Sequence, residues 1–282
     1  MNTITLKLTK QQIEKLKNTY IDELSKTPPA YSLYQIKSEN VTITAYTSMK
    51  VVFQGKDAEI YASAFKNEDF KVHAGSDEVG TGDYFGPVTV CACIVDEQAY
   101  KKLSSLKIQD SKTITDDYIL DIAPTLINTI PYSLLTLENS KYNEVHLTNN
   151  MNAIKAKLHN QAYVHLKNKY GLPKFIVIDQ FTPESSYYNY LKHEENVVRN
   201  IHFETKAESK YFAVACASII ARYAFLKKWE EMESKYNFKF TKGASDKVDK
   251  DGASFIKKFG KEELKNVAKL HFKNTDKLEE YL

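Results

Sequence analysis

The first 65 residues alternate between polar and apolar positions with the periods of short strands and helices. Residues 2–8 alternate strictly, which predicts a half-buried strand. Residues 10–25 place apolar side chains at helical spacing after a threonine that can cap the helix, and two prolines follow. Three short antiparallel strands and a second helix are predicted next, at residues 33–36, 41–47, 50–54 and 57–65. We therefore expect a small α+β domain over residues 1–66.

Beyond this domain, longer apolar strands are separated by amphipathic helices. Strands are predicted at residues 72–76, 88–95, 132–138, 174–178 and within 196–203. One helix begins after Thr115 and is expected to break at Pro124. Two more are predicted at residues 152–169 and 208–232, and the second is rich in alanine, which suits close packing on a sheet. This order predicts an α/β domain with a mixed sheet over residues 67–282.

Composition places the chain among ordinary globular proteins, with 43% hydrophobic and 27% charged residues. No apolar run is long enough to cross a membrane, and the first ten residues lack the apolar region of a signal peptide. The three cysteines form no CxxC pair, which argues against disulfides and a zinc site and fits the cytoplasm. The net charge is only +3, but residues 239–273 hold ten lysines against five acids. That segment is either a solvated face or one that contacts phosphates.

The segment with the most unusual chemistry is residues 72–90, V-H-A-G-S-D-E-V-G-T-G-D-Y-F-G-P-V-T-V. Two adjacent acids, Asp77 and Glu78, follow a short apolar strand, and three glycines come next. Glycine allows another backbone to approach closely and tolerates positive φ. Such a segment can be a solvated turn between two strands, or it can bind cations and a sugar-phosphate backbone.

Two further acids stand at element ends, Asp179 after a buried strand and Glu208 at the start of the alanine-rich helix. Sites in open α/β sheets form at the carboxyl ends of strands, so these acids can meet Asp77 and Glu78 there. Carboxylates without histidine or cysteine ligands favour Mg²⁺ or Mn²⁺ over zinc, and two such ions support phosphoryl chemistry. An isolated aspartate at a strand end is also a common turn former or helix cap.

These motifs resemble those of a known family. The segment G-S-D-E-V-G-T-G-D-Y-F-G-P is similar to the glycine-rich signature of the type 2 ribonuclease H superfamily, in the form found in bacterial ribonuclease HIII. Further blocks in the family's order are D-S-K, V-I-D-Q-F, K-A-E-S-K-Y-F-A-V-A-C-A-S-I-I-A-R and K-G-A-S-D-K-V-D, at residues 110–112, 177–181, 206–222 and 242–249. Thr81 and Glu208 favour ribonuclease HIII over ribonuclease HII, which usually has Arg and Asp at these places.

The resemblance implies a ribonuclease H-like mixed sheet with flanking helices, preceded by a TBP-like domain that binds substrate. It also implies an endonuclease that hydrolyses the RNA strand of RNA/DNA hybrids and leaves 5′-phosphate and 3′-hydroxyl ends. Two Mg²⁺ or Mn²⁺ ions would activate water and stabilise the leaving 3′ oxygen. The residues implied as their ligands are Asp77, Glu78, Asp179 and Glu208. A monomer in the cytoplasm is expected.

Candidate substrate contacts lie in several segments. By the resemblance, backbone groups of Gly80, Thr81 and Gly82 would contact the ribose 2′-OH, which distinguishes RNA from DNA. The candidates for phosphate contacts are Ser111, Lys112, Lys206 and Ser245, although Lys206 is equally suited to pair with a carboxylate. In the first domain, one sheet face can lie against nucleic acid or be merely solvated; its residues are Thr42, Thr44, Tyr46, Lys50 and Gln54.

Three alternatives remain at this point. A dinucleotide-binding oxidoreductase would use the glycines, but their spacing here is GxGxxxG and acids precede them. A non-catalytic hybrid-binding protein would not need the four acids. A ribonuclease HII-like enzyme, which incises at single ribonucleotides in DNA, is the nearest alternative.

Overall fold

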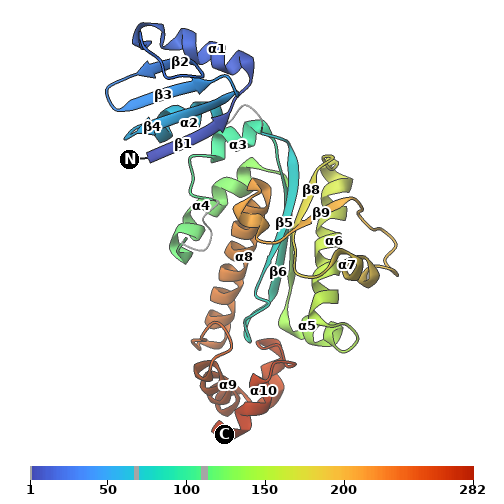
Figure 1. Cartoon of the computed structure of the whole chain (residues 1–282). Helices are drawn as coiled ribbons and strands as arrows, with labels where there is room; N and C mark the ends of the chain where they lie inside the picture. The colour runs from blue at the N-terminus through green and yellow to red at the C-terminus, as the bar shows by residue number, and fades with distance from the viewer. Residues whose placement is uncertain (1, 67–69, 109–113) are drawn as a thin grey trace. The chain divides into compact units, whose positions relative to one another are not determined.

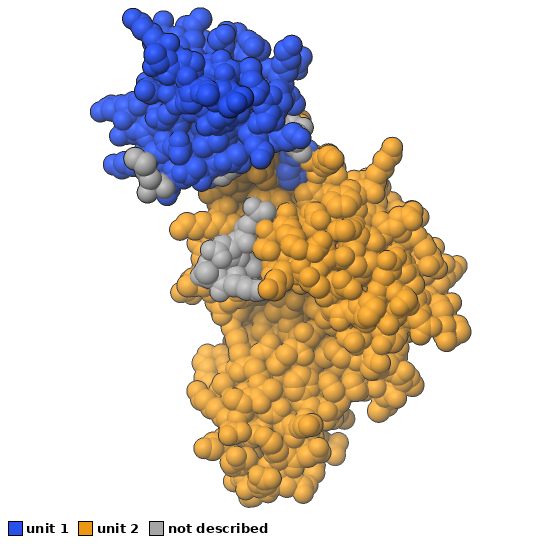
Figure 2. Space-filling view, viewed as in Figure 1, with its two compact units in different colours: residues 1–70 blue, residues 71–282 orange. Residues whose placement is uncertain are grey.

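The computed structural model describes residues 2–66, 70–108 and 114–282 (Figure 1). The chain divides into two compact units, Met1–Phe70 and Lys71–Leu282 (Figure 2). The predicted domain boundary after residue 66 adjoins residues that lie outside the described ranges, so it stays a prediction. Among the described helices, none combines the length and apolar character that crossing a membrane requires.

The first unit is a four-stranded antiparallel sheet with two helices (Figure 1). Its strand order is β1-β4-β3-β2, and the strands are β1 (Asn2–Lys7), β2 (Ser32–Lys37), β3 (Val41–Tyr46) and β4 (Lys50–Gly55). The helices are α1 (Lys10–Thr19) and α2 (Ala58–Lys66). Apolar residues from both helices, including Ile13 and Ala62, pack in one core with Ile43 and Phe53 of the sheet. This confirms the predicted small α+β fold.

Helix α1 begins as predicted but ends earlier. Thr9 and Gln12 form a capping box, in which each side chain accepts a hydrogen bond from the other residue's backbone N–H. The helix stops at Thr19 rather than near residue 25, because Leu24 forms a β-bridge with Ile36 at the edge of the sheet. The polar sheet face also differs, since Thr44 is buried and accepts a hydrogen bond from the Gln35 side chain at 3.0 Å.

The second unit contains a five-stranded mixed sheet in the order β7-β6-β5-β8-β9. Its strands are β5 (His73–Val79), β6 (Val88–Val95), β7 (Tyr132–Leu137), β8 (Ile176–Asp179) and β9 (Ile201–Glu204). The pairs β5–β6 and β6–β7 are antiparallel, whereas β5–β8 and β8–β9 are parallel. The mixed sheet confirms the predicted fold class, and β5 lies at its centre.

Helices cover both faces of this sheet (Figure 1). Helix α6 (Met151–Tyr170) packs on the face that carries Ala74 and Ala92. Helix α8 (Phe212–Tyr236) packs on the opposite face, where Cys93 donates to the carbonyl of Ala213 at 3.1 Å. The remaining helices are α3 (Glu97–Leu103), α4 (Asp116–Thr129), α5 (Asn139–His146), α7 (Glu184–Tyr190), α9 (Asp246–Phe259) and α10 (Asn274–Lys277).

Two local predictions in this unit are wrong. Helix α4 continues through Pro124, because the buried residues on either side, such as Ile122 and Leu126, hold it in the core. Glu208 does not start the long helix. It lies in a separate 3₁₀ turn, Ala207–Ser209, and α8 begins three residues later at Phe212.

The alanine-rich start of α8 packs very closely on β5. A Cβ atom placed on Gly75 would lie 2.4 Å from the backbone nitrogen of Val214 and 2.6 Å from the carbonyl carbon of Ala213. Real Cβ atoms do not approach backbone this closely, so glycine at position 75 sets the distance between the sheet and α8. Asp77, two residues further along β5, is held by the same packing.

Substituting Gly75→Ala should therefore lower stability by about 1–3 kcal/mol, the usual cost of overpacking a core. Thermal or urea unfolding measures this loss. The matched control is Gly82→Ala, whose added Cβ would meet no atom within 4 Å. Equal unfolding midpoints for the two variants would contradict the close packing of β5 on α8.

Candidate active site

Four acidic residues meet at one end of the mixed sheet. Asp77 and Glu78 are near the carboxyl end of β5, and Asp179 is the last residue of the adjacent parallel strand β8. Glu208 comes from the 3₁₀ turn after β9, and the neighbouring Ala207 N–H donates to Asp179 Oδ1 at 2.9 Å. Electrostatic interactions link Asp179 with Asp77, Glu78 and Glu208, so the four carboxylates lie near one another, and their role as one site stays a prediction.

Asp77 and Glu78 point to opposite faces of the sheet, as adjacent strand residues do. Asp77 lies on the α8 side, where Ser218 hydrogen-bonds to it, and its Oδ1 accepts the Glu78 N–H at 2.8 Å. Burial raises the pKa of Asp77 well above its usual value, and the nearby charges of Glu78 and Asp179 raise it further. A negative charge on Asp77 is therefore poorly compensated by the protein alone.

Glu78 lies on the α6 side and has two basic neighbours. Lys155 forms an ion pair with its Oε1, and His159 donates from Nε2 to its Oε2 at 2.8 Å. The other ring nitrogen of His159 is 2.8 Å from the Ser76 hydroxyl. Burial alone would raise the pKa of Glu78, but His159 and Lys155 outweigh it and hold the pKa below its usual value.

Sequence reasoning missed Lys155 and His159. Both are buried on α6, four residues apart and hence on the same side of the helix. The Lys155 ammonium also lies 4.0 Å from the centre of the Phe181 ring, and His159 stacks on that ring. One feature of the sequence could have indicated them. A lysine and a histidine stand four residues apart, next to the apolar positions of the helix predicted at residues 152–169.

Asp179, like Asp77 and unlike Glu78, has a raised pKa. Burial raises its pKa, the Ala207 N–H lowers it, and the charges of Glu208 and Glu78 raise it again. Glu208 itself is buried, with 9% of its surface exposed.

This all-oxygen donor set fits Mg²⁺ or Mn²⁺. Among the described residues, no three acid, histidine or cysteine side chains are yet arranged as a metal site. Glu78 is turned toward Lys155, so ion binding requires these side chains to close in.

The glycine-rich loop follows directly after the first two acids. Gly80 has φ +92°, and a Cβ there would lie 2.2 Å from the carbonyl oxygen of Pro87, so the fold itself requires glycine. Gly82 is exposed, and its Cβ position is open to at least 4 Å. The expected need for close approach of a substrate therefore applies to Gly82, while Gly80 is explained by local geometry.

Of the four predicted phosphate contacts, the structure describes Lys206 and Ser245. Lys206 is exposed and has φ 55°, in the left-handed region, just before the turn that carries Glu208. Ser245 is exposed at the start of α9, and the preceding Gly243 donates to Asp83 Oδ1 at 2.6 Å, which ties this segment to the glycine-rich loop. Ser111 and Lys112 lie outside the described residues.

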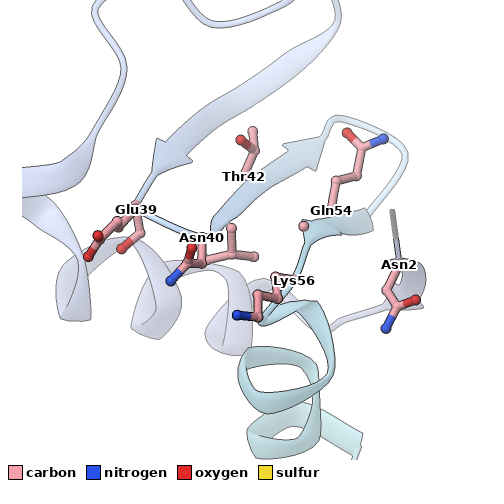
Figure 3. A pocket seen from close by; sticks show the side chains of 9 residues that line it. Asn2, Glu39, Asn40, Thr42, Gln54 and Lys56 are labelled. Carbon is pink, nitrogen blue, oxygen red and sulfur yellow. The ribbon is translucent and has the colours of Figure 1, made fainter.

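A separate polar pocket of about 590 Å³ lies in the first unit (Figure 3). It is formed where β1, β3 and β4 come together, and Gln54 and Thr42 of the predicted polar face line part of it. Its other side chains include Glu39, Asn40 and Lys56. The pocket's charged side chains are thus one lysine and one acid, among uncharged hydrogen-bonding groups.

Two protein-family models match the chain. The model described as Ribonuclease HII matches residues 74–275, and the model described as Domain of unknown function (DUF3378) matches residues 3–76. Ribonuclease HIII of Bacillus cereus is 42% identical over 303 aligned positions, which cover 98% of this chain and 97% of that protein.

Solved structures give the same result. The crystal structure of Bst-RNase HIII in complex with Mn²⁺ is similar with a TM-score of 0.72 and 36% identity, and it covers 99% of this chain and 98% of that one. The crystal structure of Aquifex aeolicus RNase H3 has a TM-score of 0.58 and 25% identity over 95% of this chain and 99% of that one. The similarity therefore extends over both compact units.

The raised pKa values of Asp77 and Asp179 predict a stability that depends on metal and pH. A raised carboxyl pKa means that the ionised group destabilises the metal-free fold at neutral pH, and the destabilisation disappears as pH falls through the raised value. Mn²⁺ should raise the thermal midpoint more at neutral than at mildly acidic pH. An ion at a hundredfold its Kd contributes about 2.7 kcal/mol.

The variant Asp77→Asn should be at least as stable as the wild type in EDTA and should lose the rise with Mn²⁺. The control is Asp121→Asn, which changes an exposed acid of α4. Differential scanning calorimetry measures both effects. A full Mn²⁺ response in Asp77→Asn would show that the ion binds elsewhere.

Proposed function

The chain belongs to the ribonuclease HIII family, and we propose that it hydrolyses the RNA strand of RNA/DNA hybrids with two divalent metal ions, Mg²⁺ or Mn²⁺. The observation that carries this proposal is the convergence of four carboxylates at one end of the mixed sheet, beside the glycine-rich loop. The products have 5′-phosphate and 3′-hydroxyl ends. The enzyme is thus a ribonuclease H acting as an endonuclease.

The residues that would hold the ions are Asp77, Glu78, Asp179 and Glu208. When bound, such ions activate water and stabilise the leaving oxygen of an in-line displacement. Asp77 and Asp179 have raised pKa values, so a cation relieves their unfavourable charge. Lys155 and His159 keep Glu78 ionised and engage both of its oxygens, so Glu78 would turn at least partly away from Lys155 to act as a ligand.

Recognition of RNA is assigned to the backbone of Gly80, Thr81 and Gly82, which would contact the ribose 2′-OH. The open surface at Gly82 supports this role. Lys206 and Ser245 are exposed on neighbouring segments and are proposed to contact phosphates. Ser111 and Lys112 keep the same predicted role.

Cleavage should depend on ribose around the scissile phosphate. We predict efficient cutting within an RNA tract, poor cutting at a lone ribonucleotide in DNA and no cutting of pure DNA, because losing one positioning contact to the substrate lowers the rate sharply. The assay compares end-labelled duplexes of these three kinds in Mg²⁺ and again in Mn²⁺. Asp77→Asn serves as the inactive control.

Each result of this assay has a distinct meaning. Equal rates at the RNA tract and the lone ribonucleotide in Mg²⁺ would favour ribonuclease HII-like specificity with the same carboxylate chemistry. Tight hybrid binding without any cleavage would favour the non-catalytic alternative. Cleavage by folded Asp77→Asn at the wild-type rate would contradict the proposed role of the carboxylates.

The first unit is proposed to bind the hybrid separately from catalysis. Its polar pocket offers hydrogen-bonding side chains such as Asn40 and Gln54, together with Lys56 (Figure 3). The amides and Lys56 suit the phosphates and hydroxyls of a nucleic-acid backbone, whereas the Glu39 carboxylate in the same pocket suits only the hydroxyls. A monomeric state and a cytoplasmic location complete the proposal.

Deleting residues 1–66 should raise the KM for a hybrid with a smaller change in kcat, because binding contacts are lost while the acids stay in place. Steady-state kinetics on the truncated and full-length proteins measure the two constants. Binding of the full-length protein should also weaken with salt, by about 0.9 log unit per phosphate contact for each tenfold increase. An unchanged KM after the deletion would contradict a role of the first unit in binding the hybrid.

A further inference from the structure

Lys269 is fully buried, and its ammonium group donates hydrogen bonds to three backbone carbonyls. Its Nζ donates to the carbonyl oxygens of Asp83 at 2.8 Å, Gly86 at 2.5 Å and Phe85 at 3.4 Å. An ammonium has three N–H donors, and here its three acceptors are carbonyls of one loop, within residues 83–86. That loop is the continuation of Gly80–Gly82.

Burying a lysine is unfavourable, and here burial lowers its pKa to about 7. An apolar side chain such as methionine fills a similar volume without this cost. The loop carbonyls, the nearby charge of Asp83 and the ring of Tyr142, 6.0 Å from the ammonium, offset part of this cost. Lys269 therefore does more than fill space in the core.

The segment around Lys269 pairs with the loop like an additional strand. Gly86 donates to the Val267 carbonyl at 2.9 Å, and Lys269 donates through its backbone to Tyr84 at 2.8 Å. The buried Asn139 side chain donates to the same Gly86 carbonyl at 2.9 Å. The distal end of the glycine-rich loop is thus fixed by groups from α5 and from the C-terminal segment.

These anchors lead directly to the glycines. The Asp83 N–H donates to the Gly80 carbonyl at 3.4 Å, which closes a tight turn over Gly80–Asp83. Lys269 holds the carbonyl of Asp83, while Gly243 holds its side chain. Because the Cβ position of Gly82 is open to at least 4 Å, packing at that position does not fix the turn. The turn is held at one end by the packing of Gly80 against the Pro87 carbonyl and at the other by the anchors at Asp83 and beyond.

We propose that Lys269 is a positioning residue for substrate recognition, which holds the backbone of Gly80–Gly82 in the arrangement that contacts the ribose 2′-OH. The proposal rests on the function proposed above. Lys269 touches neither the substrate nor the acids and acts only through the loop. Its loss should therefore reduce discrimination for ribose, rather than reduce all cleavage equally.

The test compares two hybrids with wild type and Lys269→Met. One hybrid has a uniform RNA strand, and the other carries a single 2′-deoxynucleotide on the 5′ side of the main cleavage position. The ratio of their kcat/KM values is the ribose penalty. We expect the penalty to fall at least threefold in Lys269→Met, and KM for the uniform hybrid to rise about tenfold, equivalent to about 1.4 kcal/mol.

Two controls separate positioning from stability. Lys257→Met removes an exposed lysine that donates to the Tyr281 carbonyl at 2.8 Å, and it should leave the ribose penalty unchanged. The thermal response to Mn²⁺ should persist in Lys269→Met, since the acids are untouched. If Lys269→Met does not fold, Lys269→Gln keeps an uncharged amide with two N–H donors and should lower the penalty less, again without loss of the Mn²⁺ response.

The outcomes distinguish this inference from the proposed function. A folded Lys269 variant with the wild-type penalty overturns the positioning role, even if its overall rate falls. If the wild-type enzyme cleaves both hybrids equally well, the loop does not recognise the ribose 2′-OH. That result would also contradict the proposed role of Lys269. A wild type that cleaves no hybrid contradicts the function itself.

Discussion

The repulsion among carboxylates at one end of the sheet is the constraint that organises the second unit. Asp77 and Glu78 are adjacent in β5, and Asp179 ends the neighbouring strand. The protein compensates the charges of these carboxylates to different extents. Glu78 has two basic neighbours on the α6 side, whereas Asp77, on the α8 side, is left with a raised pKa. Under the proposed function, a divalent cation would neutralise this uncompensated charge.

The rest of the unit keeps these groups in position. Gly75 allows α8 to lie directly against β5, and this contact fixes the strand that carries the first two acids. Beyond them, the chain passes into a loop whose carbonyls accept hydrogen bonds from Lys269 and Asn139. The residues that position the carboxylates and those that hold the loop thus come from different parts of the chain. Both sets lie close to the end of β5.

The sequence predicted what depends on local pattern. Alternation and apolar runs indicated the strands, and acids after strand ends indicated the carboxylate cluster. The predictions were wrong where contacts between distant residues determine the local structure. Leu24 pairs with the edge of the sheet instead of extending α1, and packing in the core keeps α4 helical through Pro124. Lys155 was missed for the same reason, since only the folded chain brings it to Glu78.

The most direct measurement is anomalous diffraction from crystals soaked in Mn²⁺. We predict anomalous density among Asp77, Glu78, Asp179 and Glu208, with the Glu78 carboxylate turned toward the ion and at least partly away from Lys155. Crystals of Asp77→Asn should lack this density. Mn²⁺ density only at other positions, with the Glu78–Lys155 ion pair intact in a protein that cleaves hybrid under the same conditions, would contradict it.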